Sequence, residues 1–203
     1  MGKLHRAVLT VLLLGFTAQL GGCLFDTREP EPPQTAAIDY LPRSSPGNIW
    51  ENCRLALTNK DSGGWDTAIS ENFEYVPDGS TESAFPGVAW ASWDKPTEMS
   101  FIGNWFASGA TIQSAQAQWK DPNSPNTEDG SGGFAEWEVI YFLSVTDNFG
   151  SSTRYRGSAV VQFSLEGSYW YLSYWRDTQG EQDPDNPAST LPTMGALRGT
   201  FGP

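Results

Sequence analysis

Histidine is almost absent from this sequence of 203 residues, and its one copy, His5, stands among the first ten. An imidazole is the usual general base near neutral pH, a member of Ser-His-Asp and Cys-His sites, and a common zinc ligand. If the first residues leave as a signal, the mature chain has no histidine. These kinds of chemistry are then excluded, and we expect no metal site and no cofactor.

Cysteine is scarce too, with only Cys23 and Cys53 in the chain. Small secreted domains that depend on disulfides carry several pairs, so no disulfide framework is expected. Cys53 falls on the apolar side of a predicted helix, where a cysteine behaves as a small buried hydrophobe. A reactive thiol is the alternative interpretation.

Basic residues are few: 12 Lys and Arg stand against 24 Asp and Glu, which gives a formal net charge of −12. An acidic surface repels both nucleic-acid phosphates and anionic lipid headgroups. The sequence therefore predicts no nucleic-acid partner, and charge does not hold the protein at a membrane.

Long apolar runs are also missing. The apolar stretch 7–18 is too short to cross a hydrocarbon core of about 30 Å as a helix. Lys3 and Arg6 precede it and small residues follow it, which is the pattern of a secretory signal peptide. The next residues, "LGGC" at 20–23, resemble the bacterial lipobox, in which cleavage occurs just before a lipidated cysteine.

The lipobox resemblance implies a signal peptide over residues 1–22 and acyl chains such as palmitate on Cys23. Two or more acyl chains give a stable membrane anchor. Leu24, rather than Asp, follows the cysteine, which implies the outer membrane, facing the periplasm. Residues 23–45 are rich in proline and predict an extended tether after the lipidated cysteine. The alternative is an ordinary secreted protein whose cysteine falls here by chance.

Residues 46–179 predict one α+β domain, because helical patterns come first and long strands follow. Ser45 and Pro46 begin the first helix, and Asp94 begins a later one. The apolar stripes expected on these two helices are Ile49, Cys53, Ala56 and Leu57 on the first, and Met99, Ile102 and Phe106 on the second. Strands are expected over 110–120, 134–147, 153–165 and 169–178. Residues 180–203 predict a loop-like tail that packs on the domain.

This order of elements resembles the nuclear transport factor 2-like fold, a cystatin-like α+β cone. The resemblance implies a strongly bent antiparallel sheet that wraps around the N-terminal helices and leaves a cavity at the wide end. A narrower resemblance rests on "TREPEPP" after the lipobox, "YWRD" at the end of the last strand, and "MGALRGTF" near the C-terminus. These motifs are similar to a group of bacterial lipoproteins of this fold, which brings no assigned activity with it.

In enzymes of this fold the cavity carries acid and base groups, usually Asp, Tyr and often His. The residues that could stand in the cavity or at its rim are Tyr75, Glu136, Glu138, Tyr141, Arg176 and Asp177. Glu136 and Glu138 could serve acid–base or metal chemistry, or lie on a solvated sheet face. Arg176 and Asp177 could form an ion pair at the rim or a link to the tail.

The run "YWYLSYW" at 169–175 places Tyr169, Tyr171 and Trp175 on one strand face. These rings could stack on a flat ligand, or they could fill the two sides of a curved sheet. Two acidic loops, 121–130 and 183–187, match the calcium-loop pattern only in part and predict soluble connections.

Taken together, the sequence favours a lipid-anchored envelope protein whose domain is a non-catalytic module that binds a partner protein or a small ligand. The alternative function is a small lyase, isomerase or hydrolase that uses Tyr, Asp or Glu in the cone cavity. A homodimer through the sheet is compatible with both. A deep pocket that holds a carboxylate with a shifted pKa would favour the enzyme, whereas a filled cavity would favour the binding module.

Overall fold

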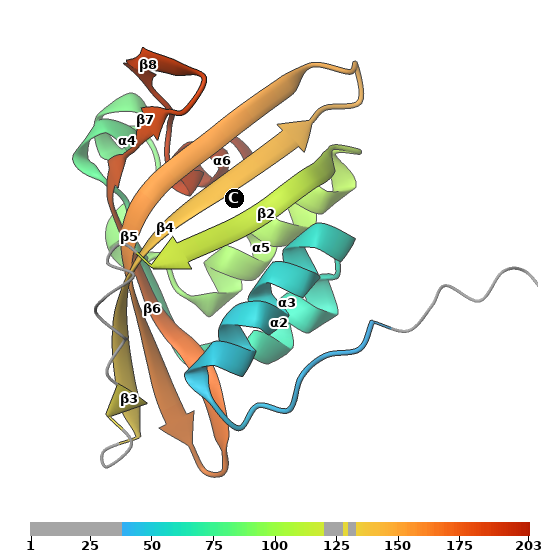
Figure 1. Cartoon of the computed structure of the whole chain (residues 1–203), viewed down its shortest axis with the longest axis vertical. Helices are drawn as coiled ribbons and strands as arrows, with labels where there is room; N and C mark the ends of the chain where they lie inside the picture. Colours follow the sequence, from blue (N-terminus) through green and yellow to red (C-terminus); the bar gives the residue numbers. More distant parts are fainter. Residues whose placement is uncertain (1–37, 120–127, 130–132) are drawn as a thin grey trace, which may run out of the picture. The chain divides into compact units, whose positions relative to one another are not determined.

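A strongly curled mixed sheet, with helices on one side of it, forms the part of the chain that begins at Ile38 (Figure 1). The computed structural model describes residues 38–119, 128–129 and 133–203. The predicted signal peptide, Cys23 and the tether up to residue 37 lie outside the described residues. The predicted α+β class is confirmed. No helix in the described part of the chain is long and apolar enough to cross a membrane.

The strands of the main sheet follow the order β1-β6-β5-β4-β2, and β3 pairs with β4 beside this path. Their bounds are β1 (Ile69–Val76), β2 (Thr111–Trp119), β3 (Glu128–Asp129), β4 (Phe134–Thr146), β5 (Ser152–Glu166) and β6 (Tyr169–Gly180). The expected antiparallel sheet is wrong at one edge, because β1 runs parallel to β6. This pairing sets Tyr75 beside Trp175 and so brings the early part of the domain to the last long strand.

Strand β4 shows the alternation that the sequence predicts, with every second side chain buried against the helices. The buried set is Ala135, Trp137, Val139, Tyr141, Leu143 and Val145. Side chains of a strand point alternately to the two faces of the sheet, so the residues between them face outward. The buried face of β4 therefore forms one wall of the core, and the helices form the other.

Helix α2 (Pro46–Asn59) begins as predicted: the Ser45 hydroxyl accepts a hydrogen bond from the Asn48 amide, 3.3 Å long. Its predicted apolar stripe is buried in full. Lys60 ends the helix in the left-handed conformation (φ 52°), and Asp61 caps the short helix α3 (Ser62–Ala68). Both helices lie against the sheet side that carries the core (Figure 1).

Helix α5 (Lys95–Ala107) follows helix α4 (Gly79–Ala84) and the 3₁₀ turn η1 (Trp90–Ser92). Asp94 caps α5 as predicted and accepts a hydrogen bond from the Thr97 amide. The predicted stripe on α5 is partly wrong, since Met99 and Phe106 are only half-buried. The buried stripe is shifted by one position and contains Glu98, Phe101, Ile102 and Trp105.

Residues 180–203 contain regular structure where a loop-like tail was expected. They form a small hairpin, β7 (Gln182–Asp183) with β8 (Asn186–Thr190), and then helix α6 (Met194–Phe201). Thr193 caps α6 by accepting a hydrogen bond from the Gly195 amide, 3.2 Å long. Helix α6 packs against α5 and β5 on the helix side of the sheet, and its residues Met194, Gly195, Leu197 and Arg198 are buried.

The stretch from Ile38 to Ser45 is fastened to the domain, although it was predicted as part of the tether. The Asn52 side chain bonds both the amide and the carbonyl of Leu41, at 2.8 and 2.9 Å. The Arg43 carbonyl accepts a hydrogen bond from the Trp170 amide, 3.0 Å long. The compact unit accordingly extends from Ile38 to Pro203.

Candidate functional site

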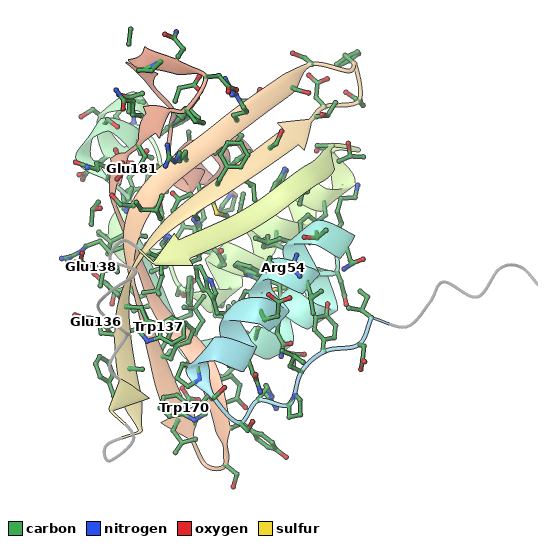
Figure 2. All side chains as sticks on the ribbon, in the orientation of Figure 1. Arg54, Glu136, Trp137, Glu138, Trp170 and Glu181 are labelled. Carbon is green, nitrogen blue, oxygen red and sulfur yellow. The ribbon has the colours of Figure 1, made fainter. Side chains whose placement is uncertain are left out.

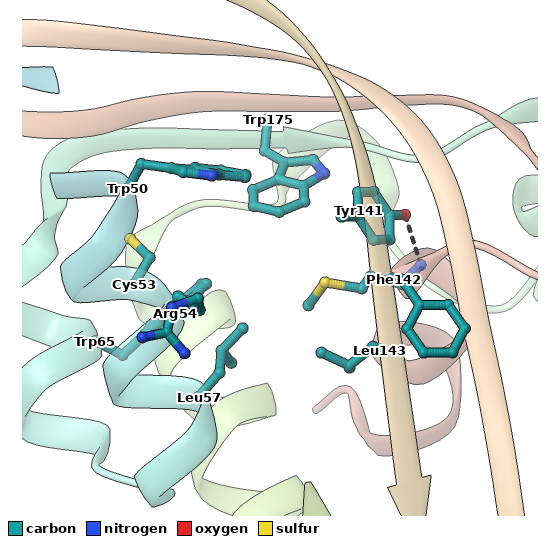
Figure 3. Close-up of a pocket in the computed structure, with 10 residues that line it drawn as sticks. Trp50, Cys53, Arg54, Leu57, Trp65, Tyr141, Phe142, Leu143 and Trp175 are labelled. Carbon is teal, nitrogen blue, oxygen red and sulfur yellow. Dashed lines mark hydrogen bonds between the residues drawn. The ribbon is translucent and has the colours of Figure 1, made fainter. Parts of the chain in front are cut away.

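A small apolar pocket lies between α2 and the buried face of the sheet (Figure 3). Its lining residues are Trp50, Cys53, Arg54, Leu57, Trp65, Tyr141, Phe142, Leu143, Trp175 and Met194. The cavity volume is about 30 Å³. A site of this size holds one or two water molecules, whereas pockets for small-molecule ligands are about ten times larger. The part of the interior between α2 and β4 is therefore nearly filled.

Helix α6 supplies part of that filling. Met194, its first residue, lines the pocket and donates its backbone N–H to the Tyr141 hydroxyl at 2.8 Å (Figure 3). Gly157 stands opposite Tyr141 on β5, where a Cβ would lie 2.6 Å from the tyrosine hydroxyl. The absence of a side chain at that position leaves room for the phenol to reach α6.

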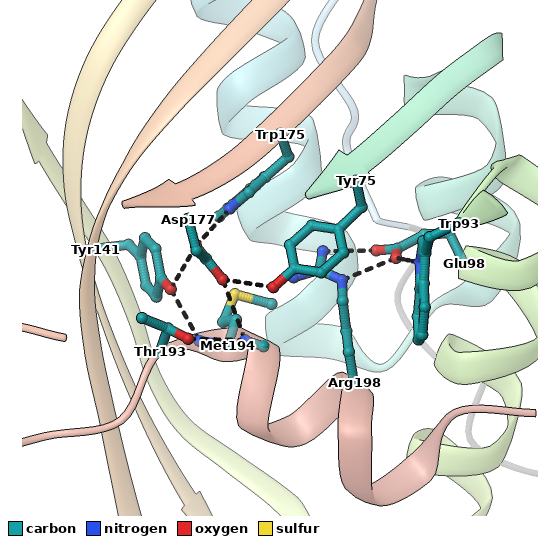
Figure 4. A network of polar contacts seen from close by, with 10 residues as sticks. Tyr75, Trp93, Glu98, Tyr141, Trp175, Asp177, Thr193, Met194 and Arg198 are labelled. Atoms are coloured by element: carbon teal, nitrogen blue, oxygen red, sulfur yellow. Dashed lines mark hydrogen bonds and ion pairs between the residues drawn. The ribbon is translucent and has the colours of Figure 1, made fainter. Parts of the chain in front are cut away.

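Asp177 is the polar centre of the interior (Figure 4). The side chain is 2% exposed, and its carboxylate accepts four hydrogen bonds from the protein. The Tyr75 and Tyr141 hydroxyls donate at 2.7 and 2.8 Å. The Trp175 indole and the Gly195 amide donate at 2.8 and 3.1 Å. Each carboxylate oxygen thus has two donors, and one of the four comes from α6.

Strand β6 contains two bulges, and the first of them, at Ser173, turns Asp177 inward. Ser173 and Thr178 are extra residues in the pairing with β5, and each reverses the alternation of side chains along the strand. Trp170 and Leu172 are buried before the first bulge, and Trp175 and Asp177 after it. The sequence placed Trp175 on the face of Tyr169 and Tyr171, and this prediction is wrong because of the bulge at Ser173.

Burial affects the protonation of Asp177 and of the two tyrosines that contact it. Burial raises the pKa of Asp177, and the positive charge of Arg198 together with the donated hydrogen bonds acts in the opposite direction. Burial and the nearby Asp177 charge raise the pKa of Tyr75 well above its ordinary value. The pKa of Tyr141 rises for the same reasons. Both phenols therefore keep their protons at neutral pH and serve as donors to the carboxylate.

A second buried group adjoins the first. The Arg198 guanidinium donates two hydrogen bonds of 2.8 Å to the Glu98 carboxylate, and both side chains are 0% exposed. Glu98 also accepts a hydrogen bond of 2.7 Å from the Trp93 indole. Burial by itself would lower the pKa of Arg198, but the Glu98 charge and hydrogen bonds raise it overall. Arg198 is thus a permanent cation inside the fold.

Aromatic rings surround this cation. The guanidinium carbon lies 4.0 Å from the centre of the Tyr75 ring and 5.4 Å from those of Phe101 and Trp175. A cation over an aromatic face is attracted by the ring's negative centre. Arg198 Nη1 has no hydrogen-bond partner among the described residues.

Asp78 fastens the start of α6 to α4. Its carboxylate accepts hydrogen bonds from the hydroxyls of Thr81 and Thr193, at 2.7 and 2.6 Å, and from the amides at the start of α4. Burial would raise the pKa of Asp78, but a further hydrogen bond from the Ser80 hydroxyl, together with those from Thr193 and Thr81, lowers it to about 2. Asp78 is therefore ionised across the physiological range.

The structure brings together three of the six candidate residues. Tyr75, Tyr141 and Asp177 meet in the interior. Asp177 also accepts a hydrogen bond from Gly195, in the segment 180–203, and a link to that segment was one of the two interpretations of Asp177. Glu136 and Glu138 point to the outer side of the sheet, away from α2 (Figure 2). Glu136 accepts a hydrogen bond from Gln162 there, and Arg176 is exposed.

The sequence missed Glu98, Arg198, Trp93 and Asp78. A signal for α6 was present, since Thr193 is a capping residue and Met194, Leu197, Arg198 and Phe201 have helical spacing. In the acidic loop 183–187, Asp183 and Asp185 both pair with Arg154, and Asp183 does so at 2.7 Å. The described residues contain no cluster of three or more metal-ligating side chains. The acidic loop 121–130 lies mostly outside them.

A second hollow, of about 580 Å³, lies outside the cone. Residues 40–43 form one side of it, and residues of α2 and α3 form the other. Tyr40 crosses it and donates its hydroxyl to Asp61 at 2.7 Å. Cys53, which faces the interior, has a pKa raised by burial, so its thiol is not reactive.

Comparisons with known proteins identify the fold. No protein-family model and no curated protein matches the chain. A conserved protein from Planctomyces limnophilus is 13% identical, with a TM-score of 0.50 over 65% of this chain and 91% of that chain. A nuclear transport factor 2-like protein from Rhodospirillum rubrum, described as of unknown function in nutrient uptake, is 13% identical, with a TM-score of 0.47 over 65% and 95%.

A hexachlorocyclohexane dehydrochlorinase is also similar, at 7% identity and a TM-score of 0.44 over 64% of this chain and 78% of that chain. Proteins of unknown function and an enzyme thus stand among the neighbours. Identities this low show the fold alone. The architecture is an α+β fold with a strongly curled mixed sheet and helices on one side, and it is shared with the protein from Planctomyces limnophilus.

Proposed function

We propose that this chain is a lipid-anchored protein of the cell envelope whose cone domain is a non-catalytic module that binds a partner protein or a small ligand. The observation that carries the proposal is the occupied interior. A general acid or base must lie within hydrogen-bond reach of its substrate. Here both oxygens of Asp177 already hold two protein donors each, and α6 covers them.

The proposed location in the cell envelope rests on the sequence before Ile38. The signal-like residues 1–22 and the lipobox-like "LGGC" support an acylated Cys23, and the proline-rich segment after it supports a tether. The acidic composition supports an anchor made of lipid rather than of charge. We place the domain at the outer membrane, facing the periplasm, where it meets envelope proteins and small periplasmic molecules, as a monomer or as a homodimer.

A small lyase, isomerase or hydrolase is the second candidate, and one observation favours it. Tyr75, Tyr141 and Asp177 form a buried group in the cone, and burial raises the pKa of the carboxyl. Perturbed carboxyls are frequent in active sites. This function requires α6 to leave the cone, because the cavity of about 30 Å³ admits no substrate.

The binding function is tested by native mass spectrometry of the full chain after incubation with envelope extract from its own source. A protein or small molecule retained in fixed stoichiometry, and unchanged over time, is the expected result. A bare chain after every extract would contradict the proposal. If the wild type converts a retained small molecule to a product and Asp177→Asn does not, the chain is an enzyme instead.

The anchor is tested separately by growth with labelled palmitate. The wild-type chain should take up the label and partition with membranes, and Cys23→Ser should do neither. Wild type that remains unlabelled, like the variant, would refute the lipid anchor and leave the binding function of the domain untouched.

A further inference from the structure

Helix α6 places one arginine in a cage that has the composition of a ligand site. At one side of the cage the Glu98 carboxylate accepts two hydrogen bonds of 2.8 Å from the Arg198 guanidinium. The walls are the rings of Tyr75, Phe101 and Trp175, with their centres 4.0 to 5.4 Å from the guanidinium carbon. We propose that this cage is a guanidinium-binding site which α6 occupies as a tethered ligand, and which takes an arginine side chain of a partner protein when α6 withdraws.

The charges of the cage select a cation. Glu98 is 0% exposed, and the Asp177 carboxylate is buried beside Tyr75, whose ring is part of the cage. A buried carboxylate without a counter-charge is costly, so a cage without Arg198 demands another cation. The planar fork of a guanidinium matches a carboxylate through two parallel hydrogen bonds and stacks on rings, which an ammonium does not do. The ligand class is therefore an arginine side chain rather than a lysine.

The cage is fixed without help from α6. Glu98 stands on α5 and is held by the Trp93 indole, while Tyr75 belongs to β1 and Trp175 to β6. Trp93 in turn packs against Phe101 and Tyr75, with ring centres 6.3 and 5.7 Å apart. The site consequently has a scaffold of strands and a helix that does not depend on its occupant.

The contacts between α6 and the cage are of a kind that an arginine of another protein can replace. It adds no strand to either sheet, so its departure breaks no strand pairing. The Nη1 amino group of its guanidinium has no hydrogen-bond partner in the described part of the chain. Leaving a buried donor without an acceptor is unfavourable. An arginine-bearing segment that places an acceptor at this position gains a hydrogen bond that α6 does not offer.

This inference rests on the proposed binding function, because it names the chemistry of the partner, and chemical rescue tests it independently. In the full-length Arg198→Ala chain, ethylguanidinium at millimolar concentration should raise the melting temperature by about 3 °C or more above the same concentration of sodium chloride. The wild type, whose cage is occupied, should not respond. The double variant Glu98→Gln/Arg198→Ala should not respond either.

The partner segment is represented by a labelled peptide with the sequence of residues 194–201 and by a matched peptide with alanine at the arginine position. Fluorescence anisotropy should show that the arginine peptide binds Arg198→Ala at least ~10-fold more tightly than the alanine peptide does. The wild type should bind the arginine peptide more weakly, since α6 competes. The arginine peptide should nevertheless remain preferred.

Absence of rescue together with equal binding of the two peptides would overturn the cage, whatever the native mass spectrum shows. Rescue of Arg198→Ala without any binding of the arginine peptide to wild type would overturn the exchange. If Arg198→Ala is unfolded, regain of its near-ultraviolet circular dichroism with ethylguanidinium becomes the readout. Arg198→Lys then provides a charged background for the same peptide comparison. An empty native mass spectrum with successful rescue would instead remove the proposed function and leave the cage.

Discussion

Removal of the Arg198 charge should be among the most damaging single changes in the interior of this domain. In Arg198→Met the apolar stem remains, but Glu98 stays buried without a counter-charge. Breaking a buried ion pair from one side costs about 3–5 kcal/mol. The whole free energy of unfolding of a domain is about 5–15 kcal/mol, so the variant should lose a large share of its stability.

A double-mutant cycle separates the ion pair from the packing around it. Glu98→Gln alone leaves Arg198 without its anion and should also cost about 3 kcal/mol. The double variant Glu98→Gln/Arg198→Met removes both charges, so it should be far more stable than the sum of the single costs predicts. The coupling free energy should reach about 2–3 kcal/mol.

Urea denaturation, followed by tryptophan fluorescence and far-ultraviolet circular dichroism, measures these free energies, and coincident transitions verify two-state unfolding. The matched control is Arg54→Met, which breaks the partly exposed pair of Arg54 with Glu51. This change should cost less than about 1 kcal/mol. A cost for Arg198→Met no larger than the control, or a cycle without coupling, would refute the reasoning.

Three further changes test the same interior. Tyr141→Phe removes one of the four donors to Asp177, so it should lower the free energy of unfolding by about 1–3 kcal/mol in urea denaturation. Asp78 has a pKa of about 2 in the fold against an ordinary value of 3.8, so its contribution of about 2 kcal/mol is present above pH 4 and is lost as the pH falls toward 2. In Asp78→Asn the melting temperature should therefore depend less on pH between about pH 4 and pH 2 than it does in the wild type. Gly195→Ala would place a Cβ 2.5 Å from the Tyr75 hydroxyl, so it should displace the start of α6 and lower the melting temperature.

Matched changes at open positions provide the controls. Gly103 lies in α5 with nothing within 4 Å of an added Cβ, so Gly103→Ala should not lower the melting temperature. Tyr169 is 52% exposed, and Tyr169→Phe should leave the free energy of unfolding almost unchanged. Controls as damaging as Gly195→Ala and Tyr141→Phe, or an Asp78→Asn curve as steep as the wild type below pH 4, would contradict these assignments.

Local patterns made much of the fold predictable. The alternation of β4 and the capping residues Ser45 and Asp94 are properties of short segments, so the sequence alone located those elements. Tyr75 and Tyr141 were named as possible cavity or rim residues from the fold resemblance rather than from a local pattern, and both are buried.

The rest depended on long-range pairing. The bulge at Ser173 exists because β5 and β6 pair with one residue too many, and nothing local marks it. The ion pair of Glu98 with Arg198 was missed because hydrophobic periodicity counts apolar residues, so each charged partner is interpreted as a surface position. Only the contact between α5 and α6 shows that two such positions neutralise each other inside.

The polar contacts of the interior join segments that are far apart along the chain: Tyr75 and Asp177 are separated by 102 residues, Glu98 and Arg198 by 100, and Asp78 and Thr193 by 115. Contacts of such high sequence separation form late and slow folding. A ribosome that has made β1 and α5 must still add about a hundred residues before Tyr75 and Glu98 find these partners. Until then Glu98 has no internal counter-charge, so the core around α5 cannot close with this buried ion pair in place.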